Sequence, residues 1–460
     1  MNLYSEPILA PITPAGYAAI SVIRLSGTGC IELVAKHVKH SAKLLKSPSH
    51  RLIHTTLYSE PGQDIDDVLL SVFRAPNSYT GEDCVEISCH GNPNIVNRIM
   101  ECLLQHCRMA KPGEFTLRAY LNSKLDLSQA EAVNDLINAQ ASKAESAALM
   151  QLHGYLSQYL RQIGQRITEA RLHCELAIDF ADQDLPQIDL DALSESIDSI
   201  LHDARELEAK GQQGKIIRDG IKVVLAGAPN AGKSSLFNAL LQHNRAIVTP
   251  HPGTTRDYLE ECISLSGFPV VIYDTAGLRD SDHEIESLGI AQSYVLMRQA
   301  DIILYLIDSS KISGQTEESI SEQSLLVQST LPPELWNKTI IVFSKADLLP
   351  QPKQSNQAGI FCSVQEPDGL KVLSETILKR LMLSEELLHK PLITNARHLA
   401  ALQKCIAGLI QAKHSLESCQ GFEFTAFELA TASSALEEIL GVISTDDLLE
   451  KIFSNFCIGK

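Results

Sequence analysis

The spacing of apolar residues divides the chain into regions of different character. Up to about residue 121, short β-rich runs, such as residues 18–25 and 68–73, alternate with loops rich in glycine, proline and asparagine. From residue 126 to about 211, apolar residues recur at helical spacing and proline and glycine are sparse, which predicts a set of long helices. Helical spacing returns from about residue 384 to the end.

The part of the chain between these two helical regions has the pattern of an α/β sheet. Short apolar runs are separated there by stretches of helix length, which is typical of buried parallel strands. We therefore predict an α/β module inserted into one helical domain, although two separate helical domains would give the same pattern. The four apolar runs are residues 221–226, 269–273, 302–307 and 339–343. The predicted domain limits are 1–121 (an α+β domain), 122–214 (helical, first part), 215–379 (α/β) and 380–460 (helical, second part).

Composition and charge narrow the class of protein. The 460 residues include 39 Lys and Arg against 56 Asp and Glu, a net charge of −17, so any contact with nucleic acid is expected to be local or shared with a partner. No apolar run approaches the ~18 residues of a membrane span. The first basic residue is Arg24, so no secretory signal is expected. The 11 cysteines include no C-x-x-C pair, which favours free thiols in a reducing cytosol.

A complete phosphate-binding motif lies in the α/β module. Residues 227–234 read GAPNAGKS, directly after a predicted strand and before an apolar helix. Glycines allow the backbone to wrap phosphates, and successive N–H groups at a helix start provide positive potential. Lys233 is placed to neutralise the β- and γ-phosphates, and the Ser234 hydroxyl to ligate Mg²⁺.

Three further motifs follow in the order expected of a GTPase. DTAG (274–277) begins where a predicted strand ends, so that Asp274 can hold Mg²⁺ and the N–H of Gly277 can sense the γ-phosphate. GTTRD (253–257) lies between this motif and the phosphate loop, where a loop should supply a threonine to the metal. SKAD (344–347) follows another strand, and Asp347 can accept both N1–H and the 2-amino group of guanine while Lys345 lies along the base. Together these motifs resemble a translation-factor-type GTPase domain that selects guanine.

Some positions depart from the usual GTPase pattern. Ser344 stands where the base-recognition motif usually has asparagine, and its shorter side chain is not expected to bridge the base and the phosphate loop in the same way. The motif that backs the base is best matched by Ser363 and Val364. Leu278 replaces the glutamine that often orients the attacking water. Four acids that follow can take over that role, and the residues alone do not choose among them: Asp280, Asp282, Glu284 and Glu286.

Several rare strings resemble the MnmE (TrmE) family of tRNA-modification GTPases, within the TrmE-Era-EngA-YihA-Septin-like superfamily. They are PNSYTGEDCVEISCHGNP (76–93), KPGEFTLRAYLNSKLDLSQAEA (111–132) and the terminal FCIGK (456–460). The resemblance runs from residue 15 to residue 460. Generic GTPases have neither the first two segments nor the tail, so the match is specific. It implies an N-terminal tetrahydrofolate-binding domain, a helical domain and a GTPase domain inserted into it.

The resemblance also implies roles within the GTPase site. Glu286 is expected to orient the water once the GTPase domains of two subunits meet, and Lys233 to act with it in catalysis. K⁺ is expected to take the place of an arginine finger. Its implied ligands are Asn230, Thr249, His251 (through its carbonyl oxygen) and Thr254, and those of Mg²⁺ are Ser234 and Thr255. The implied GTP-binding residues are Asn230, Ala231, Gly232, Lys233, Ser234, Ser235, Thr249, Thr254, Thr255, Asp274, Thr275, Ala276, Gly277, Ser344, Lys345, Asp347 and Ser363.

The same resemblance implies a second site, for the one-carbon donor 5-formyltetrahydrofolate, in a domain that also dimerises. The matching residues are Arg24, Glu86, Lys124 and Lys460. A glutamate tail suits Arg or Lys, and the N–H groups of a pterin suit a carboxylate. Cys457, in the tail, is interpreted as a packed apolar residue rather than a nucleophile.

The implied activity is GTP-dependent addition of an aminomethyl or carboxymethylaminomethyl group at carbon 5 of the wobble uridine of tRNA. The resemblance implies a cytoplasmic homodimer that forms a heterotetramer with an MnmG-like FAD protein, with no membrane span. One rival interpretation is a K⁺-dependent ribosome-assembly GTPase, which shares Asn230, GTTRD and DTAG but lacks the N-terminal strings and the tail. An ATPase is disfavoured by Asp347, although Ser344 leaves it open.

Overall fold

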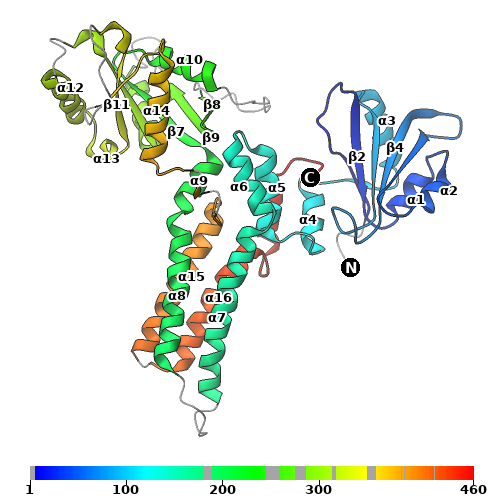
Figure 1. Ribbon diagram of the computed structural model, residues 1–460. Coiled ribbons are helices and arrows are strands. Elements are labelled where there is room, and N and C mark those ends of the chain that lie inside the picture. The colour runs from blue at the N-terminus through cyan, green and yellow to red at the C-terminus, as the bar shows by residue number, and fades with distance from the viewer. Residues whose placement is uncertain are drawn as a thin grey trace. The chain divides into compact units, whose positions relative to one another are not determined.

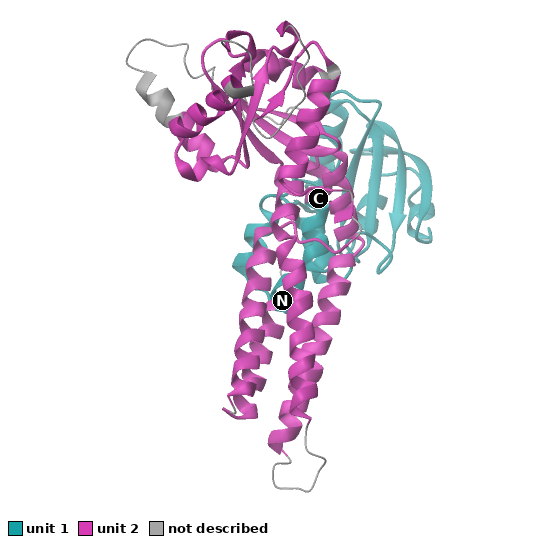
Figure 2. Cartoon of the chain, turned by 60° about the vertical axis from the view of Figure 1, so that its left-hand side comes forward, with its two compact units in different colours: residues 1–134, 436–460 teal, residues 135–435 magenta. Residues whose placement is uncertain are grey.

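The computed structural model describes residues 6–179, 189–244, 260–274, 286–312, 317–349, 359–384, 386–387, 390–418 and 420–460. Two compact units are present, coloured teal and magenta in Figure 2. Unit 1 comprises Met1–Asn134 and Leu436–Lys460, and unit 2 comprises Asp135–Ala435. The last residues of the chain therefore group with the N-terminal residues. The domain limits given above remain predictions.

Unit 1 is built on a six-stranded sheet with the order β3-β4-β5-β2-β1-β6. Figure 1 labels β2 and β4 of this sheet. Neighbouring strands are antiparallel, except that β1 and β6 run parallel. The strands are β1 (Ile8–Pro11), β2 (Ile20–Ser26), β3 (Arg51–Tyr58), β4 (Asp64–Phe73), β5 (Cys84–His90) and β6 (Arg108–Met109).

The helices α1 (Cys30–Ala35), α2 (Ser41–Leu45) and α3 (Pro93–Leu103) bury their apolar residues against this sheet. Ile31 and Ile99 share one core cluster with strand residues of alternating register, as expected for a sheet with one covered face. A second cluster joins α4 (Glu114–Leu121), the start of α5 (Leu127–Asn138) and α17 (Asp446–Phe453). Its buried members are Leu127, Ala130, Leu449, Phe453 and Phe456.

The other face of the unit 1 sheet presents apolar side chains to the outside. The register places Leu52, Glu86 and Arg24 in one row across β3, β4, β5 and β2. Leu69 and Ile20 lie an even number of residues from members of that row on their own strands, so they share its face. Leu52, Leu69 and Ile20 are exposed. This exposed apolar face continues to the central strands β5 and β2, on which Glu86 and Arg24 lie.

Unit 2 contains a group of long helices. Figures 1 and 2 both show α7 (Tyr155–Asp179), α8 (Leu190–Ala209), α15 (Ala396–Glu417) and α16 (Phe422–Leu440) side by side. Ion pairs tie α8 to both of its neighbours, through Arg166 with Asp203 and Lys413 with Asp198. Two shorter helices, α6 (Ser142–Leu152) and α9 (Gly211–Asp219), complete this part. In the parts of the chain that the structure describes, no helix combines the length and apolar character needed to cross a membrane.

The α/β part of unit 2 is a six-stranded sheet with the order β12-β11-β10-β7-β9-β8. All pairs are parallel except β8 with β9, which are antiparallel. The strands are β7 (Ile221–Gly227), β8 (Glu260–Leu265), β9 (Phe268–Asp274), β10 (Ile302–Asp308), β11 (Thr339–Ser344) and β12 (Ile360–Phe361).

Helices cover both faces of this sheet, each with its own apolar cluster. On one face lie α10 (Lys233–Asn244) and α14 (Pro367–Arg380). The other face is covered by α11 (Glu286–Gln299), α12 (Glu317–Thr330) and α13 (Pro333–Trp336). The arrangement is a doubly wound α/β domain, in which ligands bind at the carboxyl ends of the strands.

The two chain segments that join the α/β part to the long helices lie against each other. The first is α9, and the second is the segment that enters α15. An ideal Cβ at Gly214 of α9 would lie 2.0 Å from the carbonyl oxygen of Ile393. The Thr394 hydroxyl donates a hydrogen bond of 3.1 Å to Oε1 of the buried Gln151 in α6.

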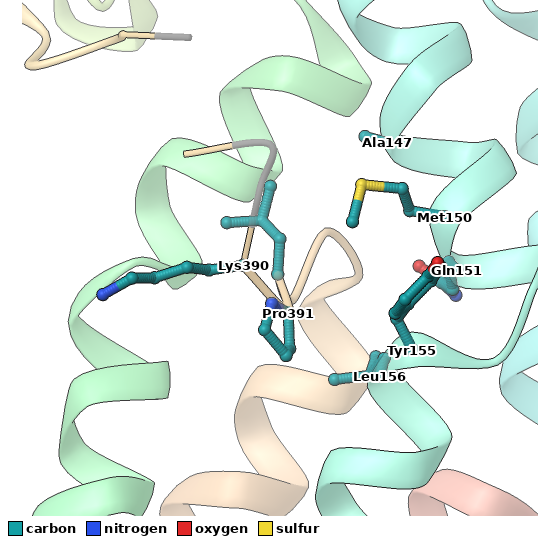
Figure 3. Close-up of a pocket in the computed structure, with 8 residues that line it drawn as sticks. Ala147, Met150, Gln151, Tyr155, Leu156, Lys390 and Pro391 are labelled. Atoms are coloured by element: carbon teal, nitrogen blue, oxygen red, sulfur yellow. The ribbon is translucent and has the colours of Figure 1, made fainter. Parts of the chain in front are cut away.

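A small cavity of about 20 Å³ lies beside this junction. Figure 3 shows Lys390 and Pro391 of the entering segment opposite Met150, Gln151 and Tyr155 from the end of α6 and the start of α7. The volume is close to that of a single water molecule. The packing beside the junction therefore leaves room for about one water molecule.

The predicted fold class is confirmed: an α+β domain, a long-helix domain and a P-loop α/β domain inserted between helices that pack together. The four predicted α/β strands correspond to β7, β9, β10 and β11. These four strands are parallel to one another, as predicted. The sheet also has an edge strand that was not predicted, β8, which pairs with β9 through a tight turn in antiparallel register. Antiparallel edge strands on otherwise parallel sheets are common.

Candidate functional site

The phosphate loop joins the end of β7 to the start of α10. Gly227 has φ +132°, and an ideal Cβ there would lie 2.3 Å from the carbonyl oxygen of Leu306 on the neighbouring strand. Gly232 has φ +92° and Asn230 φ +62°, so the backbone takes left-handed turns at both positions. Because α10 begins directly after Gly232, at Lys233, its free N–H groups face the loop.

Two side chains at the start of α10 are oriented for phosphate and metal chemistry. Lys233 is buried, and its Nζ donates to the carbonyl oxygens of Gly227 at 3.0 Å and Ala228 at 2.9 Å. Ser234 Oγ donates to Oδ2 of Asp274, the last residue of β9, at 3.3 Å. A hydroxyl and a carboxylate that face each other are hard oxygen ligands of the kind Mg²⁺ prefers. The pair therefore fits the predicted metal.

A cavity of about 230 Å³ lies next to this loop. It brings together five residues expected to bind nucleotide, Gly232, Ser235, Ser344, Lys345 and Asp347. Leu236, Val342, Leu348, Cys362, Val364 and Gln365 complete its lining.

One wall of this cavity is set by a side-chain hydrogen bond. Ser363 is buried, and its Oγ donates to Oδ1 of Asp347 at 2.6 Å. The same Oγ accepts the backbone N–H of Gln365 at 3.1 Å. The bond from Ser363 fixes the Asp347 carboxylate in orientation. A carboxylate that accepts two parallel N–H bonds distinguishes guanine from adenine, which has no such pair of donors on that edge.

Ser344 reaches the phosphate loop despite its short side chain. Its Oγ donates to the carbonyl oxygen of Ala231 at 2.7 Å, and the carbonyl oxygen of Ile307 lies 3.1 Å away. This contact with the phosphate loop was not expected of so short a side chain, and the expectation is corrected for this contact alone. The reason is that β11 ends close to the loop, so one hydroxyl spans the gap. Since that hydroxyl has one hydrogen, the contact leaves no donor for the base.

Several predicted site residues lie outside the described residues. They are the residues of the metal loop and of the segment after Asp274: Thr249, His251, Thr254, Thr255, Thr275, Ala276 and Gly277. Of the predicted K⁺ ligands, Asn230 is described. Glu286 is the first residue of α11, directly after the segment that begins at Thr275.

A second group of predicted residues meets at the open face of unit 1. Arg24 pairs with Glu86 through its Nη2 and Nε, at 2.8 Å and 2.9 Å from Oε1. The guanidinium also lies over two aromatic rings, 5.0 Å from the centroid of Tyr79 and 5.5 Å from that of Phe115. A cation held between rings is attracted by both. The site therefore consists of an ion pair flanked by two aromatic rings.

The tail of the chain brings Lys460 to the same place. The N–H of Phe115 donates to the Lys460 carbonyl oxygen at 3.1 Å. Burial, together with the charge of Arg24, lowers the pKa of the Lys460 ammonium below its usual value. Lys124 donates to the carbonyl oxygen of Pro76 at 3.1 Å. Lys460 thus lies with Arg24 and Glu86, whereas Lys124 lies between α4 and α5 and contacts the loop that carries Tyr79.

Cys457 differs from its expected role as a packed apolar residue, because it is exposed. The tail is instead held by backbone bonds and by Phe456. The carbonyl oxygen of Cys457 accepts the N–H of Gly113 at 3.4 Å, and Phe456 is buried. Tyr79 and Phe115 were not among the residues predicted for this site. Both occur inside the rare strings quoted above, which was the available signal.

Comparisons with known proteins cover the whole chain. Residues 127–457 match the MnmE helical domain, and residues 7–124 match the N-terminus of the GTP-binding protein TrmE. The tRNA modification GTPase MnmE of Aquifex aeolicus is 40% identical over 99% of this chain and 100% of its own length. The MnmE of Carboxydothermus hydrogenoformans is 38% identical over 100% of both chains. That of Clostridioides difficile is 36% identical over 99% of both.

Among solved structures, the chain is similar to the G domain of the T. maritima FeoB iron transporter, with 28% identity over 35% of this chain and 98% of that chain. The TM-score is 0.24, so no argument rests on this similarity.

Proposed function

The chain belongs to the MnmE family of tRNA modification GTPases, and from that premise we propose that it adds an aminomethyl or carboxymethylaminomethyl group to carbon 5 of the wobble uridine. It is a GTP hydrolase that acts in tRNA modification. The proposed one-carbon donor is 5-formyltetrahydrofolate, and the proposed cations are K⁺ and Mg²⁺. The observation that carries the proposal is that one chain holds both a phosphate loop beside a base-sized cavity and the separate Arg24–Glu86 site.

GTP hydrolysis is proposed to occur at the start of α10. The N–H groups of the loop and Lys233 bind the β- and γ-phosphates, and Asp347 accepts the guanine N–H groups. Ser234, Asp274 and Thr255 would hold Mg²⁺. Asn230, Thr249, His251 and Thr254 would hold K⁺. When bound, both cations supply positive charge where negative charge builds up on the transferring phosphoryl group. Thr275, Ala276 and Gly277 are proposed to bind GTP and to respond to the presence of its γ-phosphate.

Glu286 is proposed to orient the attacking water. The oxygen of this water attacks the γ-phosphorus, and the bond between the γ-phosphorus and the β-phosphate oxygen breaks. GDP and phosphate are then released. A carboxylate at the start of α11 can accept a hydrogen bond from the water, which fixes the direction of the water oxygen's lone pair. That task is general-base positioning rather than covalent catalysis.

The Arg24–Glu86 site is proposed to bind the folate. The partly exposed ring of Tyr79 provides a flat surface for a pterin, and Glu86 can accept its N–H groups. The ring of Phe115 is buried and packs against the Arg24 guanidinium. Arg24 and Lys460 offer positive charge to the carboxylates of a glutamate tail. Lys124, on the adjacent loop, is proposed to add to that charge.

The proposed partners follow from surface and charge. The apolar face that carries Leu52, Leu69 and Ile20 supports a homodimer that covers it. An MnmG-like flavoprotein is proposed to provide FAD and much of the tRNA-binding surface, which is consistent with a net charge of −17. The described cysteines are free thiols, which supports a cytoplasmic location.

Reconstitution tests the proposal. The purified chain, an MnmG-like flavoprotein, GTP, 5-formyltetrahydrofolate and an amine donor are incubated with tRNA carrying an unmodified wobble uridine. Digestion and mass spectrometry should detect the added group. Arg24→Ala should abolish the modification and leave GTP turnover intact, whereas Lys233→Ala should abolish both. If no group is added and the chain instead co-purifies with ribosomal particles, the ribosome-assembly interpretation is favoured.

A further inference from the structure

Asp308 is a buried carboxylate next to the nucleotide cavity that belongs to none of the GTPase motifs. It is the last residue of β10, and 7% of its surface is exposed. The carboxyl ends of β10 and β11 are adjacent, because Asp308 pairs with Ser344 in the parallel register. Asp308 therefore lies beside the turn that carries the base-recognition residues.

Both oxygens of Asp308 have partners. Oδ1 accepts the backbone N–H of Ser310 at 3.1 Å and the Ser310 hydroxyl at 2.6 Å. Oδ2 accepts Nζ of Lys345 at 2.7 Å. Burial acts to raise the pKa of Asp308, but the hydrogen bonds from Lys345 and Ser310 outweigh it, and the pKa lies below its usual value. The carboxylate is therefore charged at neutral pH.

Lys345 connects this carboxylate to the phosphate loop. Its Nζ donates to the carbonyl oxygen of Asn230 at 3.1 Å as well as to Asp308. Its backbone is in the left-handed region, with φ +56°, so the chain turns sharply there and the side chain lies along the cavity that it lines. A lysine has four rotatable side-chain bonds, and fixing them costs conformational entropy. An anchor at Nζ removes that cost before the nucleotide binds.

We propose that Asp308 is a positioning residue for the guanine nucleotide. Its carboxylate holds Lys345 Nζ against the phosphate loop, so that the alkyl chain of the lysine forms a fixed wall of the base cavity. This inference rests on the proposed nucleotide site. Without this contact the Lys345 side chain can move away from the base cavity, and the bound nucleotide dissociates faster.

The fold of the strand ends does not depend on this ion pair. The buried Ser309 hydroxyl donates to the carbonyl oxygen of Ser344 at 2.6 Å, and this bond ties the ends of β10 and β11 together. The Ser344 hydroxyl adds the bond to Ala231. Removal of the Asp308 charge therefore changes what holds Lys345, while the connection between the strands remains.

The test is the release of a fluorescent GDP analogue from the full-length protein. Asp308→Asn should release it about tenfold faster, the loss expected for one charge-assisted hydrogen bond. Ser310→Ala is the matched control, because it removes the hydroxyl bond to the carboxylate and keeps both the backbone N–H bond and the ion pair. It should release the analogue at the wild-type rate.

A double variant separates positioning from a general structural effect. In a Lys345→Met background, Asp308→Asn should cause no further acceleration, because the interaction is already lost. The inference would be overturned if Asp308→Asn released the analogue at the wild-type rate. It would also be overturned if the release rate of the double variant rose by the product of the two single effects. If Asp308→Asn does not fold, Lys345→Met breaks the same pair and must itself give the faster release. Failure of the wild-type protein to bind the analogue would instead overturn the proposed nucleotide site.

Discussion

Two charged side chains of unit 1, Glu114 and Arg118, are almost completely buried, at 2% and 1% exposure. Glu114 accepts hydrogen bonds from Arg108, from Arg118 at 3.0 Å and from the Lys111 N–H at 3.0 Å. Arg118 also pairs with Glu82 at 3.0 Å. A carboxylate in such a place is stable only with its partners, because loss of one partner leaves an uncompensated buried charge.

Replacement of this carboxylate gives the first prediction. Glu114→Gln should lower the free energy of unfolding by roughly 3–5 kcal/mol at pH 7. Burial acts to raise the pKa of Glu114, but the bonds from Arg108, Lys111 and Arg118 outweigh it and lower it. The carboxylate therefore stabilises the fold above the unfolded pKa of about 4.3, and this contribution is lost as the pH falls through the lower folded pKa.

Chemical denaturation between pH 7 and pH 3 measures this effect. The difference between the variant and the wild type should be full at pH 7 and should shrink below about pH 4. Glu206→Gln is the matched control, since this carboxylate pairs with Lys210 and Lys390 on the surface and should contribute little. A pH-independent difference for Glu114→Gln would show that packing, not charge, is responsible.

The water-positioning acid is the second prediction at the residue scale. Glu286→Ala should lower GTP turnover about 10²-fold, the usual contribution of a group that positions the reacting water, and should leave GTP binding unchanged. Single-turnover hydrolysis and equilibrium binding measure the two quantities separately. Asp282→Ala, another acid of the same segment, is the control. Unchanged turnover for Glu286→Ala would remove this residue from the proposed mechanism.

Sequence spacing places motif residues well, because each motif follows a strand whose end the α/β architecture brings to one edge. Asp274, Ser344 and Asp347 could be located in this way. Asp308 follows a strand too, but no motif marks it, and its role depends on a lysine 37 positions later. The reach of Ser344 to Ala231 depends on a distance between two elements, which a residue pattern does not contain.

At the scale of elements, the junction of α9 with the segment entering α15 has no spare room. Gly214→Ala would place a Cβ 2.0 Å from the Ile393 carbonyl oxygen, which is backbone and must shift. We predict destabilisation by roughly 1–3 kcal/mol, the usual cost of overpacking. Thermal unfolding of unit 2 and hydrogen exchange at α9 measure it.

Gly164 provides the matched control for this substitution. It is also a helical glycine, in α7, but an ideal Cβ there meets no atom within 4 Å. Gly164→Ala should raise the free energy of unfolding by roughly 0.5–1 kcal/mol, since alanine loses less conformational freedom than glycine in a helix. Equal effects of the two substitutions would contradict the packing argument.

Element types could be predicted where the apolar pattern is continuous. The buried strands β7, β10 and β11 and the long helices α7 and α15 all coincide with predicted segments. The edge strand β8 and the two-residue strands β6 and β12 could not be predicted. The strands β6 and β12 have two residues each, and β6 pairs with β1, which is distant in the sequence. The strand β8 pairs with β9 across a tight turn, but its polar and partly exposed residues interrupt the apolar pattern.

At the scale of the whole molecule, the return of the tail to unit 1 is the feature that the residue pattern did not predict. Helical periodicity continues to the end of the chain, so the last residues were expected to belong with the preceding helices. The packing of α17 on α4, with Phe453 and Phe456 buried beside Leu127, instead carries Lys460 to Arg24. A long-range contact of this kind depends on complementary surfaces, which spacing along the chain does not encode.

The central claim, a cation-assisted GTPase built around the loop that contains Asn230, is tested most directly by GTP turnover in KCl and in NaCl at equal ionic strength. We predict at least roughly tenfold faster turnover in KCl, because a bound cation of the right size stabilises charge on the transferring phosphoryl group. Equal rates in the two salts would contradict the claim, since they would mean that Asn230 and the residues from Thr249 to Thr254 do not form a K⁺ site.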